Sequence, residues 1–113
     1  MRVTSEFWVS ALCRRTALEG AFAYVAKRGA AEAGAIFILS DDMQGGNTLF
    51  APAPQAHFDP DETADRLFEV RDQGDRFAML EIIEREKKFD PDLWLVEIED
   101  REKRVLWNVV EDE

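Results

Sequence analysis

The only histidine of the chain, His57, is followed closely by two carboxylates, Asp59 and Asp61. An imidazole beside carboxylates can act as a general base, and carboxylate oxygens can bind a hard cation. These three residues fall in the longest stretch without a regular pattern, residues 52–65. They are therefore candidate binding residues of a small enzyme or a ligand-binding protein with its site in this loop. The structural alternative is a loop histidine with no part in binding.

The cation interpretation weakens when the segment is compared with an EF-hand calcium loop. Oxygen-bearing side chains alternate as in the first part of such a loop, at Asp59, Asp61, Thr63 and Asp65. The sixth position should then be glycine and the twelfth a bidentate glutamate. Ala64 and Val70 stand there instead. We therefore expect no metal site and no cofactor.

The same two aspartates belong to a tetrapeptide, Phe-Asp-Pro-Asp, that occurs twice, at Phe58–Asp61 and Phe89–Asp92. Asp-Pro is typical of a helix start, and proline also forces the residue before it out of the helical region. The first copy thus predicts a short helical turn and the second predicts the end of a helix. Both copies can be structural punctuation without a role in binding.

Four basic residues form the only cluster of positive charge in the sequence: Arg14, Arg15, Lys27 and Arg28. Such a cluster can bind an anionic ligand, which would make the protein an anion-binding regulator. The same side chains can also form an ordinary solvated surface. Cys13 beside them alternates with apolar residues, so we expect a small buried side chain rather than a reactive thiol.

The three tryptophans are expected to pack in the core or against the sheet. Trp107 has a further possibility, because Val105–Val110 alternates like a strand. If this strand forms an edge of the sheet, its unpaired backbone could accept another chain. Trp107 would anchor that contact, either with a protein partner or with a second copy of the chain.

The spacing of apolar residues predicts the elements that must position these side chains. Alternation over Phe7–Arg14 predicts a strand, and the capping box of Thr16 and Glu19 predicts a helix that ends at Gly29. The remaining ranges are strands at 35–40, 48–51, 66–71, 93–99 and 105–109 and a helix at 76–88. Each half then has the order β-α-β-β. We expect an α+β fold, one domain over 1–113, with a largely antiparallel sheet and both helices on one face.

Charge is distributed unevenly along the chain. The net charge is −10, and residues 58–113 hold nine basic and 19 acidic residues, which accounts for all of it. This charge disfavours nucleic acid and anionic membranes as partners, and favours a basic partner. No run approaches the ~20 apolar residues of a membrane-spanning helix. The first residues do not resemble a secretion signal and the single cysteine cannot form an internal disulfide, so we expect a cytoplasmic location.

The sequence contains no phosphate loop, nucleophile elbow or metalloprotease motif. It therefore favours a non-enzymatic binding or protein-interaction module that uses a sheet edge and the acidic C-terminal half. The enzyme or ligand-binding protein with a site around His57 and the anion-binding regulator remain as alternatives.

Several segments together resemble a bacterial family of short cytoplasmic proteins of unknown function. They are Met1–Leu12, Gly34–Phe37, Pro52–Gln55, Asp65–Glu69 and Phe89–Trp94. The resemblance spans nearly the whole chain and implies a single domain of this length. It implies no activity and provides no catalytic residues that could be transferred to this sequence.

Overall fold

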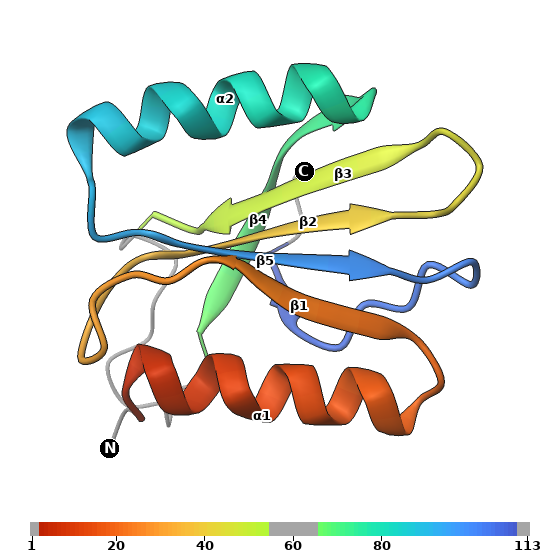
Figure 1. Ribbon diagram of the computed structural model, residues 1–113, viewed down its shortest axis with the longest axis horizontal. Coiled ribbons are helices and arrows are strands. Elements are labelled where there is room, and N and C mark those ends of the chain that lie inside the picture. Colours follow the sequence, from red (N-terminus) through yellow and green to blue (C-terminus); the bar gives the residue numbers. More distant parts are fainter. Residues whose placement is uncertain (1–2, 55–65, 111–113) are drawn as a thin grey trace.

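The computed structural model describes residues 3–54 and 66–110, which form two helices and one sheet (Figure 1). In chain order the elements are α1 (Ser5–Leu18), β1 (Phe22–Lys27), β2 (Ile36–Asp41), β3 (Asn47–Pro52), β4 (Leu67–Gly74), α2 (Arg76–Phe89), β5 (Trp94–Glu99) and β6 (Asn108–Val109).

The sheet has six strands in the order β1-β5-β2-β3-β4-β6. Three neighbouring pairs are antiparallel (β1 with β5, β2 with β3, β3 with β4), while β2 with β5 and β4 with β6 are parallel. The predicted α+β class with a mostly antiparallel sheet is therefore confirmed. The central strands β2 and β5 form the longest parallel pair, and the chain between them includes α2.

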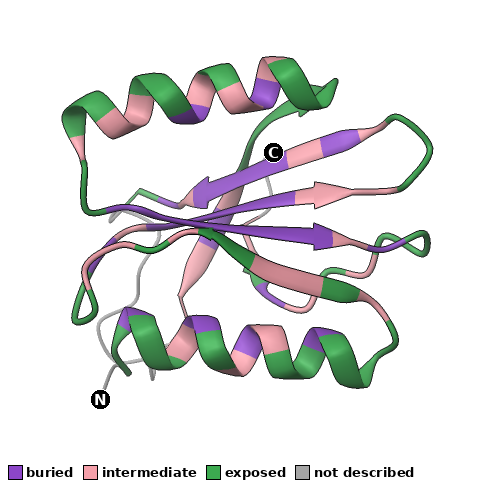
Figure 2. Cartoon of the chain, in the orientation of Figure 1, coloured by how far each residue is buried: buried purple, intermediate pink, exposed green. Residues whose placement is uncertain are grey.

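The two helices cover opposite faces of this sheet, so the prediction that both pack on one face was wrong (Figures 1 and 2). Val9 and Leu12 of α1 pack on one face, and Met79 and Ile83 of α2 pack on the other. The physical reason lies in β2, where successive residues alternate between the two cores and all of Ile36–Leu39 is buried. A strand buried on both faces needs a cover on each.

The first two elements also differ from the prediction. Phe7–Arg14 lies in a helix, and Phe22–Lys27 of the predicted first helix is a strand. Thr4 caps α1 by accepting a hydrogen bond from the N–H of Phe7 at 3.1 Å. The buried positions of α1 follow helical spacing, namely Ser5, Val9, Leu12 and Thr16. Phe7, which the alternation placed in the core, is 62% exposed. The β-α-β-β order of the first half is therefore absent.

The second half of the structure agrees better with the elements that the sequence predicts. Asp75 caps α2 by accepting from the N–H of Ala78, and the helix ends at Phe89, where Asp90-Pro91 begins. The second Phe-Asp-Pro-Asp copy thus ends a helix and leads into β5, as predicted. The first copy lies outside the described residues. The last predicted strand is shorter than expected, because β6 has only two residues.

Candidate functional site

The candidate residues from the sequence have different positions relative to the described structure. His57, Asp59 and Asp61 lie outside the described residues. Trp107 lies in the core on the α1 side of the sheet and is only 7% exposed. Its ring meets that of Phe50 edge-on, with centroids 5.0 Å apart and planes at 81°. Trp107 is therefore a packed side chain and not the exposed anchor that the strand pattern predicted.

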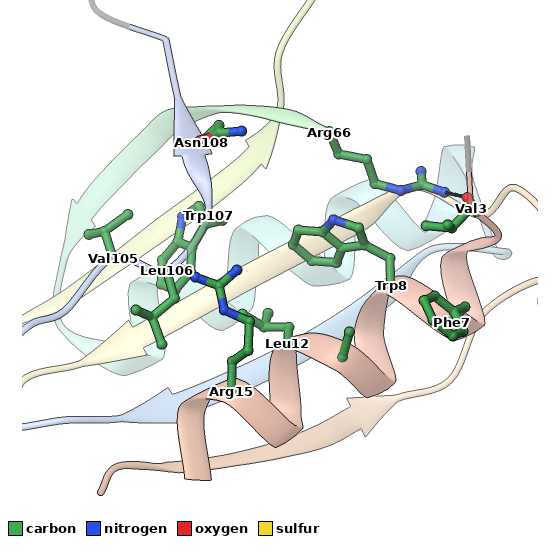
Figure 3. Close-up of a pocket in the computed structure, with 11 residues that line it drawn as sticks. Val3, Phe7, Trp8, Leu12, Arg15, Arg66, Val105, Leu106, Trp107 and Asn108 are labelled. Atoms are coloured by element: carbon green, nitrogen blue, oxygen red, sulfur yellow. Dashed lines mark hydrogen bonds between the residues drawn. The ribbon is translucent and has the colours of Figure 1, made fainter. Parts of the chain in front are cut away.

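Trp107 also lines a cavity of about 450 Å³ between α1 and the segment 105–108 (Figure 3). This volume lies within the range of small-molecule sites. The cavity walls come from α1, from the residues just before α1 and β4, and from the chain before β6. The lining residues are Val3, Phe7, Trp8, Ala11, Leu12, Arg15, Arg66, Val105, Leu106, Trp107 and Asn108. We call this cavity the α1 pocket.

One stripe of α1 forms the helical wall of the α1 pocket. Trp8, Leu12 and Arg15 are separated by four and three residues, so they lie on one side of the helix. The Trp8 ring packs against that of Phe68 of β4, with ring centroids 5.3 Å apart, and Leu12 is buried in the core. Arg15 lies one turn further along and carries its guanidinium over the cavity toward residues 105–107 (Figure 3). The stripe thus places an aromatic face and a cation at the same cavity.

The opposite wall is the segment 105–108, which a polar turn directs back across the sheet. The carboxylate of Asp100 accepts hydrogen bonds from the backbone N–H groups of Glu102 and Arg104. Lys103 in this turn has a positive φ of 55°. The chain then pairs β6 with β4, and the Val110 N–H donates to the Phe68 carbonyl at 2.8 Å. The wall is therefore fixed at both of its ends.

The polar groups at the α1 pocket are mainly hydrogen-bond donors. Arg66 donates to the carbonyl oxygen of Val3 at 2.9 Å. Arg15 forms no ion pair with any carboxylate of the described residues. The indole N–H of Trp107 is buried and has no acceptor among residues 3–54 and 66–110. A buried donor without an acceptor costs about 1–3 kcal/mol.

The structure separates the four basic residues that the sequence grouped together. Lys27 donates to the carbonyl oxygens of Pro91 and Leu93, at 2.7 and 2.9 Å. Arg28 forms an ion pair with Glu6 and lies over the Trp94 ring, 5.1 Å from its centroid. Lys27 and Arg28 therefore connect elements of the fold.

Of the two remaining basic residues, Arg14 is exposed, and only Arg15 reaches the α1 pocket. Arg66 joins Arg15 there from a distant part of the sequence. The helical spacing of Trp8, Leu12 and Arg15 was the signal that could have identified this wall.

A second polar cluster joins β1, β5 and α2 on the other face of the sheet. Glu97 of β5 is buried and pairs through both carboxylate oxygens with the guanidinium of Arg76, one of the two contacts being 3.1 Å long. Tyr24 stands opposite Glu97 on β1, and burial raises the pKa of its phenol, helped by a hydrogen bond to Glu97. Glu97 is therefore a structural carboxylate rather than part of an exposed acidic surface.

Cys13 lies on α1, where it is half-buried and packs against the core. Burial raises the pKa of its thiol above the ordinary value, so the thiol is protonated at neutral pH. No group of three or more His, Cys, Asp or Glu side chains in the described ranges could hold a metal ion. No helix in these ranges is long and apolar enough to cross a membrane.

Comparisons with known proteins identify the family to which the chain belongs. The family model described as a protein of unknown function (DUF1491) matches residues 3–108, and the chain belongs to this family. A family member from Caulobacter crescentus CB15, solved as a crystal structure, is 34% identical with a TM-score of 0.81, over 98% of this chain and 100% of its own.

A solution structure of a protein from A. tumefaciens is 44% identical, with a TM-score of 0.85, over 100% of this chain and 98% of its own. The comparison with curated proteins found no match. The predicted family resemblance is thus confirmed, and the family's function is unknown.

Proposed function

We propose that this protein is a non-enzymatic binding module and that the α1 pocket takes a small organic anion with an apolar body. One observation carries the proposal: the guanidinium of Arg15 extends over a cavity walled by Trp8, Leu106 and Trp107 (Figure 3). A cation held over an apolar, aromatic cavity suits a ligand that has one charged end and one apolar end.

The charged end is expected to be a carboxylate or a phosphate ester. Guanidinium groups bind both through paired, charge-assisted hydrogen bonds. The described lining residues include two arginines and no carboxylate. Arg15, which pairs with no carboxylate of the described residues, supplies the positive charge for this end of the ligand. The negative net charge of the chain repels anions at long range. The pocket is therefore expected to bind mainly anions that also gain apolar contacts.

The apolar end is expected to be flat and aromatic. The Trp8 ring is partly exposed and lines the cavity, where it can stack with a second ring at about 4.5–7 Å. Leu106 and Val105 supply aliphatic contacts on the opposite side. A benzoate-sized molecule therefore fits within the cavity and matches the composition of its walls.

Binding without catalysis is supported by the chemistry of the walls. The described lining residues carry no hydroxyl, thiol, imidazole or carboxylate, so they offer neither a nucleophile nor a general base. Arginine and tryptophan bind and orient a ligand without these functions. We further propose that the protein acts in the cytoplasm, which the lone Cys13 supports.

Four probes test the proposed ligand class: benzoate, phenyl phosphate, inorganic phosphate and benzyl alcohol. Each is titrated into ¹⁵N-labelled protein while amide shifts of α1 and of residues 105–108 are followed. We expect saturable shifts with benzoate or phenyl phosphate and at least tenfold weaker effects with inorganic phosphate and benzyl alcohol. Equal responses to benzoate and benzyl alcohol would remove the role of the charge, and no response to any probe would contradict the proposal.

A further inference from the structure

The outer strand β1 leaves one side of its backbone unpaired. In the sheet order β1 is the first strand, and β5 is its only partner among the described strands. The other end of the sheet is β6, which has two residues against the six of β1. A free strand edge presents a row of N–H and C=O groups. Beyond Phe68 the outer side of β4 also pairs with no described strand, but Glu69, Arg71 and Asp72 place charges along it. β1 is therefore the less protected template for pairing with another chain.

The edge of β1 lacks the usual protection against such pairing. Charged side chains commonly prevent edge-to-edge association, yet Phe22–Ala26 contains none. Phe22 and Val25 are exposed by 58% and 40%. Lys27 at the end of the strand is turned back toward the carbonyls of Pro91 and Leu93. The exposed part of the edge is thus apolar and open.

On the face of the sheet where Phe22 and Tyr24 lie, the helix α2 does not cover β1. α2 packs on β3 and β4, and Figure 1 shows it above the part of the sheet farthest from β1. Phe22 and Tyr24 form an aromatic pair there, with centroids 5.6 Å apart. An added strand would find an aromatic surface beside its backbone pairing.

Charge favours a basic occupant over a second copy. Glu99 stands directly opposite Phe22 on β5 and forms no ion pair within the described ranges. Its neighbour on the same side of β5, Glu97, is already neutralised by Arg76. Two copies would each bring a net charge of −10 and repel one another. A lysine or arginine on an added strand could cross the Phe22 ring and reach the Glu99 carboxylate.

We propose that the β1 edge accepts an extended segment of another protein in which apolar and basic residues alternate. The segment pairs with the free backbone of β1 and continues the sheet. Its apolar side chains face Val25 and its basic side chains face Phe22 and Glu99. This interaction is separate from the α1 pocket, which lies beside β4 and β6 at the opposite end of the sheet from β1.

Two eight-residue peptides test the proposal, one alternating valine with lysine and one alternating valine with glutamate. Hydrogen exchange of the β1 amides is measured at saturating peptide. We expect the lysine peptide to slow exchange of the outward amides of residues 22–25 at least tenfold, and the glutamate peptide to leave them unchanged. Unaltered β1 amides, or equal protection by both peptides, would overturn the proposal.

A matched pair of variants separates edge pairing from general attraction to an acidic surface. Val25→Lys places a charge on the edge and should weaken binding of the lysine peptide at least tenfold. Val70→Lys changes a similarly exposed valine, 46% exposed, on β4 and should leave binding unchanged. Circular dichroism melting verifies that both variants fold. Equal binding by the two variants, or a dimer that protects β1 without peptide, would contradict the proposed partner.

Discussion

Replacing Arg76 by methionine leaves Glu97 as a buried carboxylate without its cation. The Glu97 side chain is 7% exposed and that of Arg76 is 45% exposed. Breaking a fully buried ion pair costs about 3–5 kcal/mol. Because the Arg76 side of the pair is open to water, solvent can partly replace the lost guanidinium. We therefore expect the variant to lose about 2–3 kcal/mol in its free energy of unfolding. This is a large share of a total stability of about 5–15 kcal/mol.

Urea unfolding followed by circular dichroism measures this loss directly. A double variant, Arg76→Met with Glu97→Leu, is the informative comparison, because apolar replacement of both partners is often neutral or stabilising. We expect it to regain most of the stability that the single variant loses. A single-variant loss below about 0.5 kcal/mol would show that water already screens the pair and would refute the reasoning.

Three further results follow from local geometry. Gly29→Ala should destabilise the fold by about 2–3 kcal/mol in urea unfolding, because its new methyl group would overlap with the backbone of Asp92 and Leu93, and unchanged stability would contradict this close packing. Thr4→Ala should cost about 1 kcal/mol by removing the cap of α1, and a loss below 0.3 kcal/mol would argue against that cap. Cys13 should react slowly with a disulfide reagent, and the pH at half-maximal rate should lie above that of free cysteine, because the raised pKa keeps the thiol protonated to higher pH. A half-maximal rate at or below the pH of free cysteine would contradict the burial of this thiol.

The first helix shows why the sequence misled the assignment of α1 and β1. Apolar residues at 7, 9, 11 and 13 alternate like a strand, yet the helix uses a different set that includes Ser5 and Thr16. The sequence predicted Thr16 to be a cap that starts a helix. Its hydroxyl instead donates to the carbonyl of Leu12 within the last turns of α1. A buried hydroxyl that bonds its own helix leaves no trace in an apolar pattern.

The arrangement of the helices could have been predicted more closely. Leu93–Ile98 and Ile36–Leu39 are almost continuously apolar, which is typical of strands covered on both faces. Both segments are indeed central strands buried on both faces, between α1 and α2. Apolar runs of this kind indicated two layers of helices, and alternation in the other segments obscured that indication.

The α1 pocket was harder to predict because its parts are distant in the sequence. Trp8 and Arg15 lie on α1, Arg66 precedes β4 and Trp107 precedes β6. Their approach depends on the parallel pairing of β4 with β6, which consists of two residue pairs among the described residues. No local pattern predicts so short a pairing. The role of His57, Asp59 and Asp61 stays a prediction from the sequence.

The affinity of benzoate for the unaltered protein, for Arg15→Met and for Arg14→Met tests the central proposal most directly. Arg14→Met is the matched control, because it removes the same charge from an exposed neighbour that does not line the pocket. Isothermal titration should show at least tenfold weaker binding for Arg15→Met, equivalent to about 1.4 kcal/mol, and unchanged binding for Arg14→Met. Equal loss in both variants, or no loss in Arg15→Met, would contradict the α1 pocket as an anion site.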